Sequence, residues 1–488
     1  MGIIFPASRS NKYLKAGNEP YGIQTISNMK RKIPVQFIPL ALITFSYGCR
    51  EHKQQPNIIF LLTDDQRYDA MGYTGNPYIT TPNIDRLAEN GIIFNNAFVT
   101  TSISCASRAS ILTGQYASRH GISDFTTDLS DSALVRTYPL ILKEKAEYRI
   151  GYIGKYGVGL NKQPADKYDY WNCVKAIQPK YENFDSTGKM IHFTDLINMQ
   201  IEEFLDKFGT NGPFCLSVGF KAPHAEDADP RQFIYNKRYS DYYKDLDYPR
   251  PESGNEKYWY LFPEEFRRNN EARNRWKIRF ETDSLFRESV RGYYRLIQGV
   301  DDVVGNIERK LKELGIENNT IIIMMGDNGF FLGEHGLADK WFPYEESVRV
   351  PLFIYNPAEK NENKGRKIND IALNIDIAPT ILEFAGIERD KRMQGEPLQK
   401  TWQKTNRRWR KMFFYEHRFE HPGIPKSEAV ISSDYKYIRY YELPDSNEEF
   451  YDLRRDPKEI NNLIYSPEYK NIISNQKILL DSLRLTVR

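Results

Sequence analysis

The sequence predicts an α/β fold with a doubly wound, mixed but mostly parallel sheet flanked by helices. Two observations predict it. First, four apolar runs lack polar alternation, which is typical of strands buried on both faces; they are NIIFLLTDD (57–65), YRIGYIGKYG (148–157), PFCLSVGFKAPH (213–224) and TIIIMMGDNG (320–329). Second, helical patterns lie between these runs, and alternation of strand with helix favours a parallel sheet covered by helices.

The helical patterns have recognisable ends or faces. In TTPNIDRLAENG (80–91), Thr81 is placed to cap the helix, Pro82 lies in its first turn and Gly91 ends it. Further along, apolar residues recur every three or four positions and predict a long amphipathic helix. These residues are Val290, Tyr294, Ile297, Val300, Val304, Ile307, Leu311 and Leu314.

The chain changes character after about residue 400. We assign residues 56–400 to the main domain, with an aromatic-rich, charged insertion at 225–285 that we expect to cover a functional site. Residues 405–488 contain short alternating runs and a final helical stretch. This pattern predicts a smaller C-terminal α+β subdomain built on an antiparallel sheet.

Composition limits the classes of function. The chain has 488 residues, of which 40% are hydrophobic and 14% aromatic, enough for a large core. Its net charge of +3 gives no reason to expect a nucleic-acid partner. The four cysteines form no CxxC pair, which disfavours a zinc knuckle or a disulfide framework.

The N-terminal segment predicts export. Met29 begins MKRKIPVQFIPLALITFSYGC, a basic head followed by an apolar stretch, as in a signal peptide. Gly48-Cys49 resembles a bacterial lipoprotein cleavage box, so we expect a periplasmic or cell-surface protein that could be lipid-anchored through Cys49. We assign residues 1–49 to this leader and take Met29 as its start, with a plain membrane anchor as the alternative.

Polar side chains follow every predicted strand. They are Asp64 and Asp65, Lys155, Lys221 and His224, and Asp327 and Asn328. In open α/β sheets the ligand site lies at the carboxyl ends of the strands, so we expect a shared site there. The pairs Asp64–Asp65 and Asp327–Asn328 supply hard oxygen ligands, which favour Ca²⁺, or less readily Mg²⁺, over zinc. The alternative for each pair is a capped turn.

A cationic set accompanies these carboxylates. Arg108, Lys155 and Lys340, together with His224, suit an oxyanion substrate such as a sulfate or phosphate ester. We expect a helix from about Arg108 to Ser118 whose N-terminus faces the anion. Ser104, just before it, is the candidate nucleophile, although Ser104 or Ser107 could instead simply cap the helix.

The segment SCASRASILTG (104–114) resembles the sulfatase signature, in which Cys or Ser, any residue, Pro or Ala, Ser and Arg precede Leu-Thr-Gly. Further blocks are similar to sulfatase blocks in the same order: NIIFLLTDDQR, GYIGKYG, FKAPH, GDNGFFLGEHGLADKW, YEESVRVPL and FYDLRRDPKEINNL. The resemblance runs from about Asn57 to Leu463. It implies the alkaline-phosphatase superfamily and relatives among bacterial arylsulfatases and N-acetylglucosamine-6-sulfatases.

The resemblance implies a mechanism. Ser104 would be oxidised to formylglycine by an anaerobic radical maturase, and its hydrated form would attack sulfur. Asp64, Asp65, Asp327 and Asn328, with the modified Ser104, would hold Ca²⁺. Asp327 would act as base, Arg108 would stabilise the diol, Lys155 and Lys340 would neutralise the sulfuryl oxygens, and His224 would protonate the leaving oxygen.

Two departures from the family pattern stand out. Gly157 occupies a place where many sulfatases have His, although the N-acetylglucosamine-6-sulfatase branch also lacks it. Ala106 replaces the commoner Pro. Cys105 lies beside the expected nucleophile, but the spacing to Arg108 selects Ser104.

Three other histidines are candidate substrate contacts. His335 could reach the sulfate or the leaving group, and His417 and His421 could border a sugar pocket; a structural role is the alternative for each. The overall prediction is hydrolysis of a sulfated carbohydrate. The rival predictions are a phosphomonoesterase or phosphodiesterase that uses unmodified Ser104, and a non-catalytic protein that binds sulfated glycans.

Overall fold

The computed structural model describes residues 55–185, 187–403, 408–443 and 447–488. The predicted signal peptide and Cys49 lie outside these residues, so the prediction of export stays untested. Residues 54–488 form one compact unit by their internal contacts. Within the described part of this unit, no helix combines the length and apolar character that a membrane span requires.

The centre of the unit is a mixed, mostly parallel sheet, as predicted. Its eight strands run in the order β13-β2-β12-β9-β1-β8-β4-β5, and β12 is antiparallel to both of its neighbours. Their bounds are β1 Asn57–Asp64, β2 Ile92–Phe94, β4 Arg149–Gly154, β5 Tyr170–Cys173, β8 Phe214–Pro223, β9 Thr320–Gly326, β12 Leu352–Tyr355 and β13 Arg366–Ile368. The four apolar runs therefore supply β1, β4, β8 and β9, which lie side by side in the sheet.

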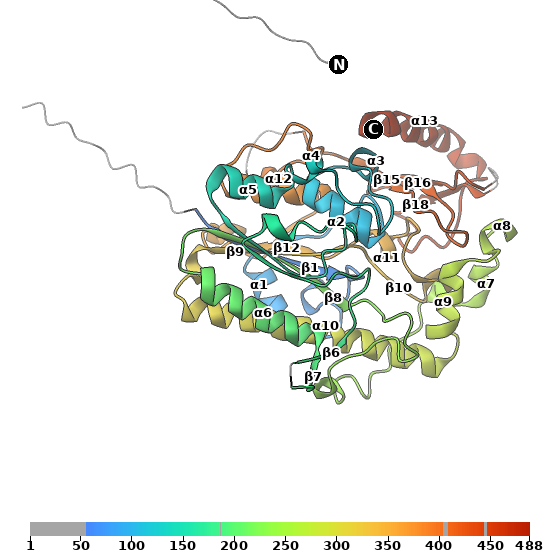
Figure 1. Cartoon of the computed structure of the whole chain (residues 1–488). Coiled ribbons are helices and arrows are strands. Elements are labelled where there is room, and N and C mark those ends of the chain that lie inside the picture. Colours follow the sequence, from blue (N-terminus) through green and yellow to red (C-terminus); the bar gives the residue numbers. More distant parts are fainter. Residues whose placement is uncertain (1–54, 186, 404–407, 444–446) are drawn as a thin grey trace, which may run out of the picture. The chain divides into compact units, whose positions relative to one another are not determined.

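Helices cover both faces of this sheet (Figure 1). One layer contains α1 (Pro82–Glu89), α6 (Phe193–Phe208) and α10 (Asp283–Glu313), and the other contains α2 (Ser104–Thr113), α5 (Tyr138–Ala146) and α12 (Ile377–Phe384). Alternate residues of β1 serve the two layers: Ile58 and Phe60 pack into the α2 layer, whereas Ile59 and Leu61 pack into the α10 layer. Two-sided burial explains why the strand is apolar at every position.

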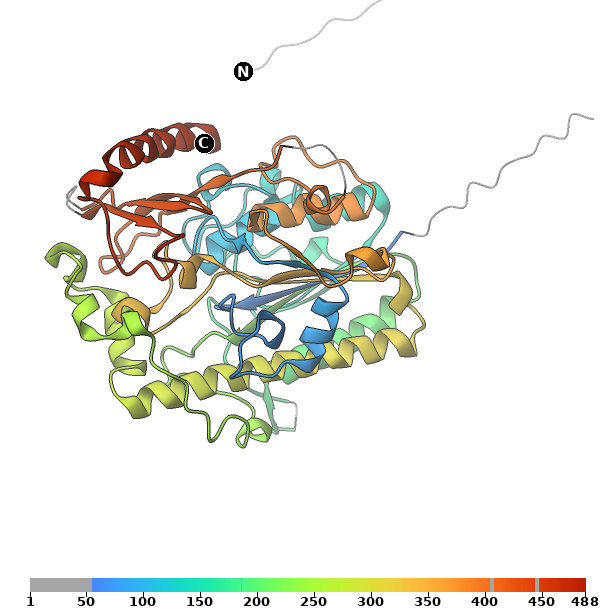
Figure 2. The same cartoon turned by 180° about the vertical axis from the view of Figure 1, so that it is seen from behind.

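The C-terminal region forms a separate antiparallel sheet, as predicted. Its strands are β15 (Met412–His417), β16 (Ser427–Ser432), β17 (Tyr435–Arg439) and β18 (Glu449–Asp452), followed by α13 (Lys470–Val487). Figure 2 shows from behind that α13 lies along this sheet. The backbone N–H of Glu416 in β15 donates to the carbonyl of Thr100, just before α2, so the small sheet is tied to the segment that leads into the signature.

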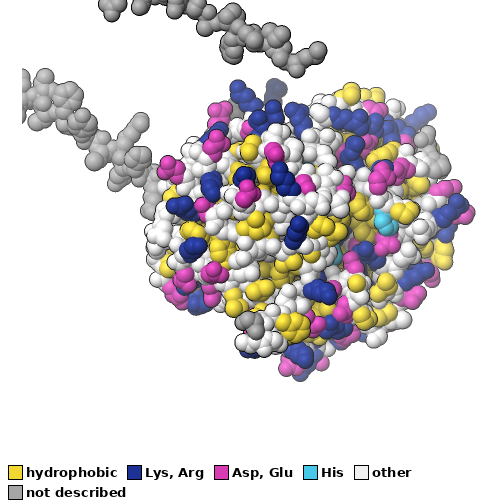
Figure 3. All heavy atoms as spheres, in the orientation of Figure 1, with side chains coloured by type: hydrophobic (Ala, Val, Ile, Leu, Met, Phe, Trp, Pro, Cys, Tyr) yellow, Lys and Arg dark blue, Asp and Glu magenta, His cyan; other side chains and the backbone are white. Residues whose placement is uncertain are grey.

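Short elements complete the fold. The insertion contains α7 (Glu256–Trp259), α8 (Glu264–Arg267) and α9 (Glu271–Arg279), and a hairpin joins β10 (Phe331–Leu332) to β11 (Ala338–Asp339). Besides several 3-10 turns, the other short strands and α-helices of the described residues are β3 Ala97–Phe98, β6 Glu182–Phe184, β7 Met190–His192, β14 Ala372–Leu373, α3 Ala117–His120, α4 Asp131–Leu134 and α11 Glu345–Val348. Positive and negative side chains are interspersed over the face shown in Figure 3, in keeping with the net charge of +3.

The helix predicted from Arg108 to Ser118 has different bounds. It is α2, which begins at Ser104 and ends at Thr113. Gly114 ends it because its backbone adopts the left-handed conformation, with φ +67°, and its N–H returns to the carbonyl of Ser110. The long amphipathic helix is α10, which begins before Val290, at Asp283.

Candidate active site

Ser104 is the first residue of α2, and neither Ser104 nor Ser107 caps the helix. The N-cap position is Ile103, an extended residue that makes no side-chain cap. Ser104 Oγ instead donates to Asp64 Oδ1 at 2.9 Å, and Ser107 Oγ accepts from Asn374 Nδ2 at 2.9 Å. The capping alternative was therefore wrong, and the Ser104 hydroxyl is directed at the end of β1, where backbone N–H groups of a helix N-terminus also lie.

The ends of β1 and β9 bring the predicted carboxylates together. The backbone N–H of Asp65 donates to Asp327 Oδ1 at 3.1 Å, and Asn328 Nδ2 donates to Asp65 Oδ1 at 2.7 Å. Asp65 lies beyond an irregularity in the pairing of β1 with β8 and has φ +59°. This turn aims its carboxylate at the cluster rather than along the strand.

Each carboxylate of the cluster has a cationic partner. Lys155 Nζ pairs with Asp64, Lys340 Nζ lies 2.5 Å from Asp65 Oδ1, and Arg108 Nε donates to Asp327 Oδ2 at 2.8 Å. Arg108 also donates to the carbonyl of Lys155 at 2.6 Å. Three buried acids and three buried bases can share this interior because every charge is paired.

Burial and charge set the pKa values of these carboxylates differently. Burial alone would raise the pKa of Asp64, but Lys155, His224 and Arg108 outweigh it and hold that pKa below its usual range. Burial raises the pKa of Asp65 to about 7 against the opposing charge of Lys340, and Asp64 and Asp327 add to the rise. Burial and the charge of Asp64 also raise the pKa of Asp327. Asp327 is therefore a stronger base than Asp64, whose pKa is lowered.

His224 joins the cluster from the end of β8. Its Nε2 lies 3.4 Å from Asp65 Oδ2 and 3.0 Å from Gln178 Nε2, while its Nδ1 lies 2.5 Å from the carbonyl of Ala225. Burial, with the charge of Lys340, lowers the pKa of His224 to about 3. These contacts favour a neutral ring with its proton on Nδ1 and with Nε2 accepting from the Gln178 amide.

No sequence pattern indicated two neighbours of the cluster, Gln178 and Tyr293. Gln178 lies in a loop after β5, and Tyr293 of α10 donates from its hydroxyl to the carbonyl of Asp65 at 2.7 Å. Lys221, in contrast, ends a predicted strand but turns away. It pairs with Glu226 at 2.7 Å and lies over the ring of Tyr181.

The donor set fits a divalent cation. Asp64, Asp65 and His224 each offer a ligand atom within 4.8 Å of the others. Asp65 Oδ2 and Asn328 Oδ1 are buried and, within the described residues, have no hydrogen-bond partner. Unpartnered buried oxygens are costly unless a ligand takes them, and a mainly carboxylate and amide set suits Ca²⁺ or Mg²⁺. The sequence predicted that His224 shares this site, but not that it offers a ligand atom beside Asp64 and Asp65.

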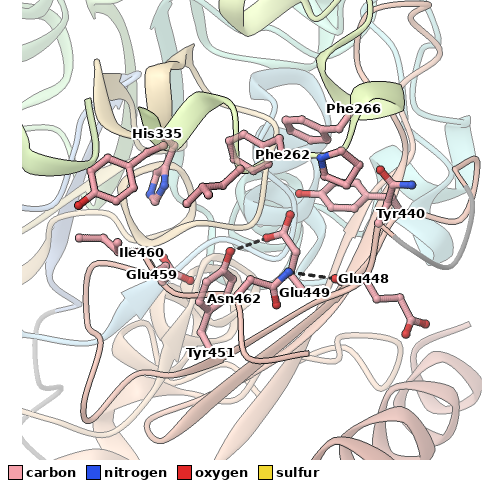
Figure 4. Close-up of a pocket in the computed structure, with 14 residues that line it drawn as sticks. Phe262, Phe266, His335, Tyr440, Glu448, Glu449, Tyr451, Glu459, Ile460 and Asn462 are labelled. Atoms are coloured by element: carbon pink, nitrogen blue, oxygen red, sulfur yellow. Dashed lines mark hydrogen bonds between the residues drawn. The ribbon is translucent and has the colours of Figure 1, made fainter. Parts of the chain in front are cut away.

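His335 lines a cavity apart from these contacts (Figure 4). Its ring stacks on Tyr344 with centroids 4.5 Å apart, and its Nε2 has no hydrogen-bond partner among the described residues. The cavity also exposes Glu449 and Tyr451 of β18 and Phe262 and Phe266 of the insertion. No contact found for His335 in the described chain is with the carboxylate cluster, so its proposed reach to sulfate stays a prediction.

His417 and His421 lie where the C-terminal sheet meets other segments. His417 ends β15, is fully buried, and has no partner for either ring nitrogen within the described residues. The ring of Phe419 packs against His417, His421 and Phe125. His421 is half-buried and borders a cavity of about 520 Å³. Their contact with a sugar also stays a prediction.

The structure gives a physical account of Gly157 and of Cys105, the residue beside Ser104. Gly157 has φ +74°, and a Cβ there would lie 2.7 Å from Cδ of Arg108, so a side chain at this place would displace the arginine. Burial raises the pKa of the Cys105 thiol to about 12. Cys105 is therefore a protonated buried thiol beside Ser104, not a competing nucleophile.

Comparison with known proteins agrees with this arrangement. A family profile described as Sulfatase matches residues 56–387, and one described as N-sulphoglucosamine sulphohydrolase, C-terminal, matches residues 333–486. An N-acetylglucosamine-6-O-sulfatase of Bacteroides thetaiotaomicron is 30% identical, over 94% of this chain and 92% of that protein. An arylsulfatase of Clostridium perfringens is 30% identical, over 88% of this chain and 94% of that protein.

Solved structures share the fold. One, described as a complex with its substrate D-glucosamine-2-N,6-O-disulfate, has a TM-score of 0.75 and 27% identity, and covers 89% of this chain and 98% of its own. A phosphonate monoester hydrolase of Agrobacterium radiobacter has a TM-score of 0.74 at 20% identity, over 89% of this chain and 96% of its own. With the profile match over most of its length, the chain belongs to the sulfatase family of the alkaline-phosphatase superfamily and is a sulfuric ester hydrolase.

Proposed function

We propose that this enzyme removes sulfate from a sulfated carbohydrate with formylglycine formed from Ser104 and with a bound Ca²⁺ ion. The observation that carries the proposal is the position of Ser104, at the N-terminus of α2 and hydrogen-bonded to Asp64 within three buried carboxylate–cation pairs. A plain serine would stop at a stable sulfate ester. A hydrated aldehyde offers a nucleophilic hydroxyl and a second hydroxyl that expels sulfate.

The residues of the chain divide the remaining work. Asp327, whose pKa burial raises, accepts the proton of the attacking hydroxyl, and Arg108 holds Asp327 in place through its Nε. Lys155 and Lys340 neutralise the charge on the sulfuryl oxygens. His224 protonates the leaving oxygen from Nε2, and the negative substrate favours the charged ring that this step requires.

The cation would be held by Asp64, Asp65, Asp327 and Asn328, with Ser104 beside them. Its positive charge would polarise a sulfate oxygen and lower the pKa of a bound hydroxyl. The unpartnered oxygens of Asp65 and Asn328 support this assignment. Ca²⁺ is preferred to Mg²⁺ because the site offers many oxygen donors in an irregular arrangement.

A sulfated sugar is the proposed substrate class. The relatives named above act, by their names, on N-acetylglucosamine 6-sulfate or on aryl sulfates, and a related structure holds a disulfated glucosamine. His417 and His421 are proposed to border the sugar, and His335 to face the sulfate or leaving group. We also propose export to the periplasm or cell surface, directed by the leader at residues 1–49, with lipidation at Cys49.

The first test is the mass of the tryptic peptide that ends at Arg108, from protein co-expressed with a radical maturase. A loss of two hydrogens at Ser104, together with release of sulfate from glucosamine 6-sulfate, supports the proposal. An unmodified Ser104 under these conditions contradicts it. Hydrolysis of phosphate esters by the unmodified protein would then favour the phosphoesterase, and glycan binding without turnover would favour a binding protein.

A further inference from the structure

We propose that Arg279 of α9 is a positioning residue that holds Lys340 at the active site by way of Asp339. The inference rests on the proposed function in one respect, the role of Lys340 toward the sulfuryl oxygens. The sequence predicts only that the insertion at 225–285 covers the site. This inference adds that the insertion holds a residue of the site in position.

The backbone around Lys340 is strained on both sides. Asp339 has φ +66° and Trp341 has φ +85°, although neither is glycine. Left-handed backbone is unfavourable for a residue with a side chain, and more so for a bulky one. Such a conformation persists only where the surroundings impose it, so contacts outside the segment must hold Lys340 in its place.

Two arginines of α9 supply these contacts. Arg279 NH1 pairs with Asp339 Oδ1, and Arg275 NH1 lies 2.5 Å from Asp339 Oδ2. The side chains of Asp339 and Arg279 are each 1% exposed. The guanidinium of Arg275 also lies over the ring of Trp341, 5.1 Å from its centroid. Helix α9 therefore contacts both residues that flank Lys340.

Arg279 is itself fixed on all sides. Its Nε donates to Gln232 Oε1 at 2.7 Å and its NH2 donates to Asp227 Oδ1 at 2.6 Å. All three guanidinium nitrogens are thus engaged. A buried guanidinium with a planar set of partners orients them more strictly than a flexible ammonium does, so Arg279 can transmit a defined position to Asp339.

The consequence falls on the Lys340–Asp65 pair. Lys340 Nζ lies 2.5 Å from Asp65 Oδ1 with 5% of its side chain exposed. Loss of the ion pair between Arg279 and Asp339 would let the strained segment relax, and the Lys340 ammonium would move with it. Lys155, the other lysine of the cluster, directly follows β4, and its ion pair and backbone hydrogen bond are with Asp64 and Gly219 rather than with α9, so it serves as an internal reference.

The test compares the reactivity of the two lysines in one molecule. Folded protein receives a brief pulse of acetic anhydride, and mass spectrometry gives the acetylation of Lys340 relative to Lys155. In Arg279→Met, we expect this ratio to rise about fivefold or more, because local opening exposes Lys340 alone. Arg279→Lys, which restores one charged donor, should recover part of the protection.

Lys436→Met is the matched control. Lys436 is also fully buried between two carboxylates, 3.0 Å from Glu345 and 2.6 Å from Glu459, but it belongs to the C-terminal sheet. The Lys436→Met variant should be less stable, but its acetylation of Lys340 relative to Lys155 should not change. An unchanged ratio in Arg279→Met, or an equal rise at both lysines, overturns the proposal and leaves Arg279 a general stabiliser. If Arg279→Met fails to fold, Asp339→Asn tests the same link, since Asn tolerates the left-handed backbone.

Turnover gives a second readout. In matured enzyme, Arg279→Met should lower kcat about tenfold or more, because small displacements of a catalytic group are costly. In a Lys340→Ala background, the same substitution should change kcat little. Equal losses in both backgrounds contradict a role through Lys340. The labelling result does not depend on sulfatase activity, so failure of the proposed function and failure of this inference remain distinguishable.

Discussion

Ser104 Oγ donates to Asp64 Oδ1 at 2.9 Å, joining the first residue of α2 to the last residue of β1. We predict that Ser104→Ala abolishes sulfate release, by about a thousandfold or more, because Ser104 is the only hydroxyl that hydrogen-bonds to Asp64 among the described residues. Stability should fall by at most about 1–3 kcal/mol, the cost of one unpaired buried acceptor. Sulfate release and urea unfolding measure the two effects. Ser110→Ala, two turns along α2, should keep most of the activity, and turnover by Ser104→Ala would refute the assignment.

Arg108→Lys should be severe despite the conserved charge. Arg108 is fully buried and binds Asp327 through Nε and the Lys155 carbonyl through NH1. A lysine ammonium has enough N–H donors but lacks the planar guanidinium that reaches both groups from different nitrogens, so the buried Asp327 carboxylate loses its close partner at a cost of about 3–5 kcal/mol. We expect a lower midpoint of urea unfolding and loss of most activity. A variant with native stability and turnover would show that the arginine fork is dispensable.

Gly157→His should not restore the commoner family pattern. The backbone at Gly157 is left-handed, and an added Cβ would lie 2.7 Å from Cδ of Arg108. Strain and overpacking each cost about 1–3 kcal/mol, and displacement of Arg108 should lower kcat. Gly157→Ala separates the Cβ effect from that of the imidazole and should already show most of the loss. Higher activity in Gly157→His would contradict this reading.

Binding of a cation should depend on pH through Asp65. In the metal-free protein, burial raises the pKa of Asp65 to about 7. Because this folded-state pKa lies above the unfolded one, the stability from protonated Asp65 is present at low pH and is lost as pH rises through about 7. A cation replaces the proton, so the rise in Tm caused by Ca²⁺ should grow between about pH 5.5 and about pH 8.

Calorimetry with Ca²⁺ and with EDTA measures this rise. Binding below pH 7 should also release about one proton per ion, seen as a dependence of the binding heat on the buffer. Asp65→Asn removes the titrating group, so it should both weaken Ca²⁺ binding and reduce the pH dependence of the Tm shift. An equal Tm shift at both pH values would exclude Asp65 as the coupled group.

His417 should make the fold sensitive to acid. Burial lowers its pKa to about 3, whereas in the unfolded chain the group titrates near its ordinary value. Between those values the unfolded state binds one more proton at this group than the folded state does, so His417 by itself lowers stability by about 1.4 kcal/mol for each pH unit below about 6.5. His417→Phe, which leaves no ring nitrogen unpartnered, should reduce this slope by about one proton in urea unfolding from about pH 4.5 to about pH 6. An unchanged slope would contradict it.

The sequence predicted the core of the site because those residues sit beside strong local signals. Asp64, Lys155, His224 and Asp327 each follow an apolar strand, and parallel strands bring their carboxyl ends to one edge of the sheet. The start of α2 was missed because Ile103 provides no capping signal, and Ser104 had to be placed by its spacing from Arg108. A local pattern can locate a strand end, but it cannot fix where a helix without a cap begins.

The sequence by itself determined the fold class and which charged residues lie near Ser104 at the strand ends, because hydrophobic periodicity and short motifs act over a few residues. Only the tertiary structure decided that Gln178 contacts His224, that Asp65 Oδ2 has no hydrogen-bond partner among the described residues, and that Arg279 of α9 pairs with Asp339. These contacts join residues far apart in the chain through side-chain packing. Sequence periodicity cannot predict such contacts, because they depend on how whole helices and strands pack together.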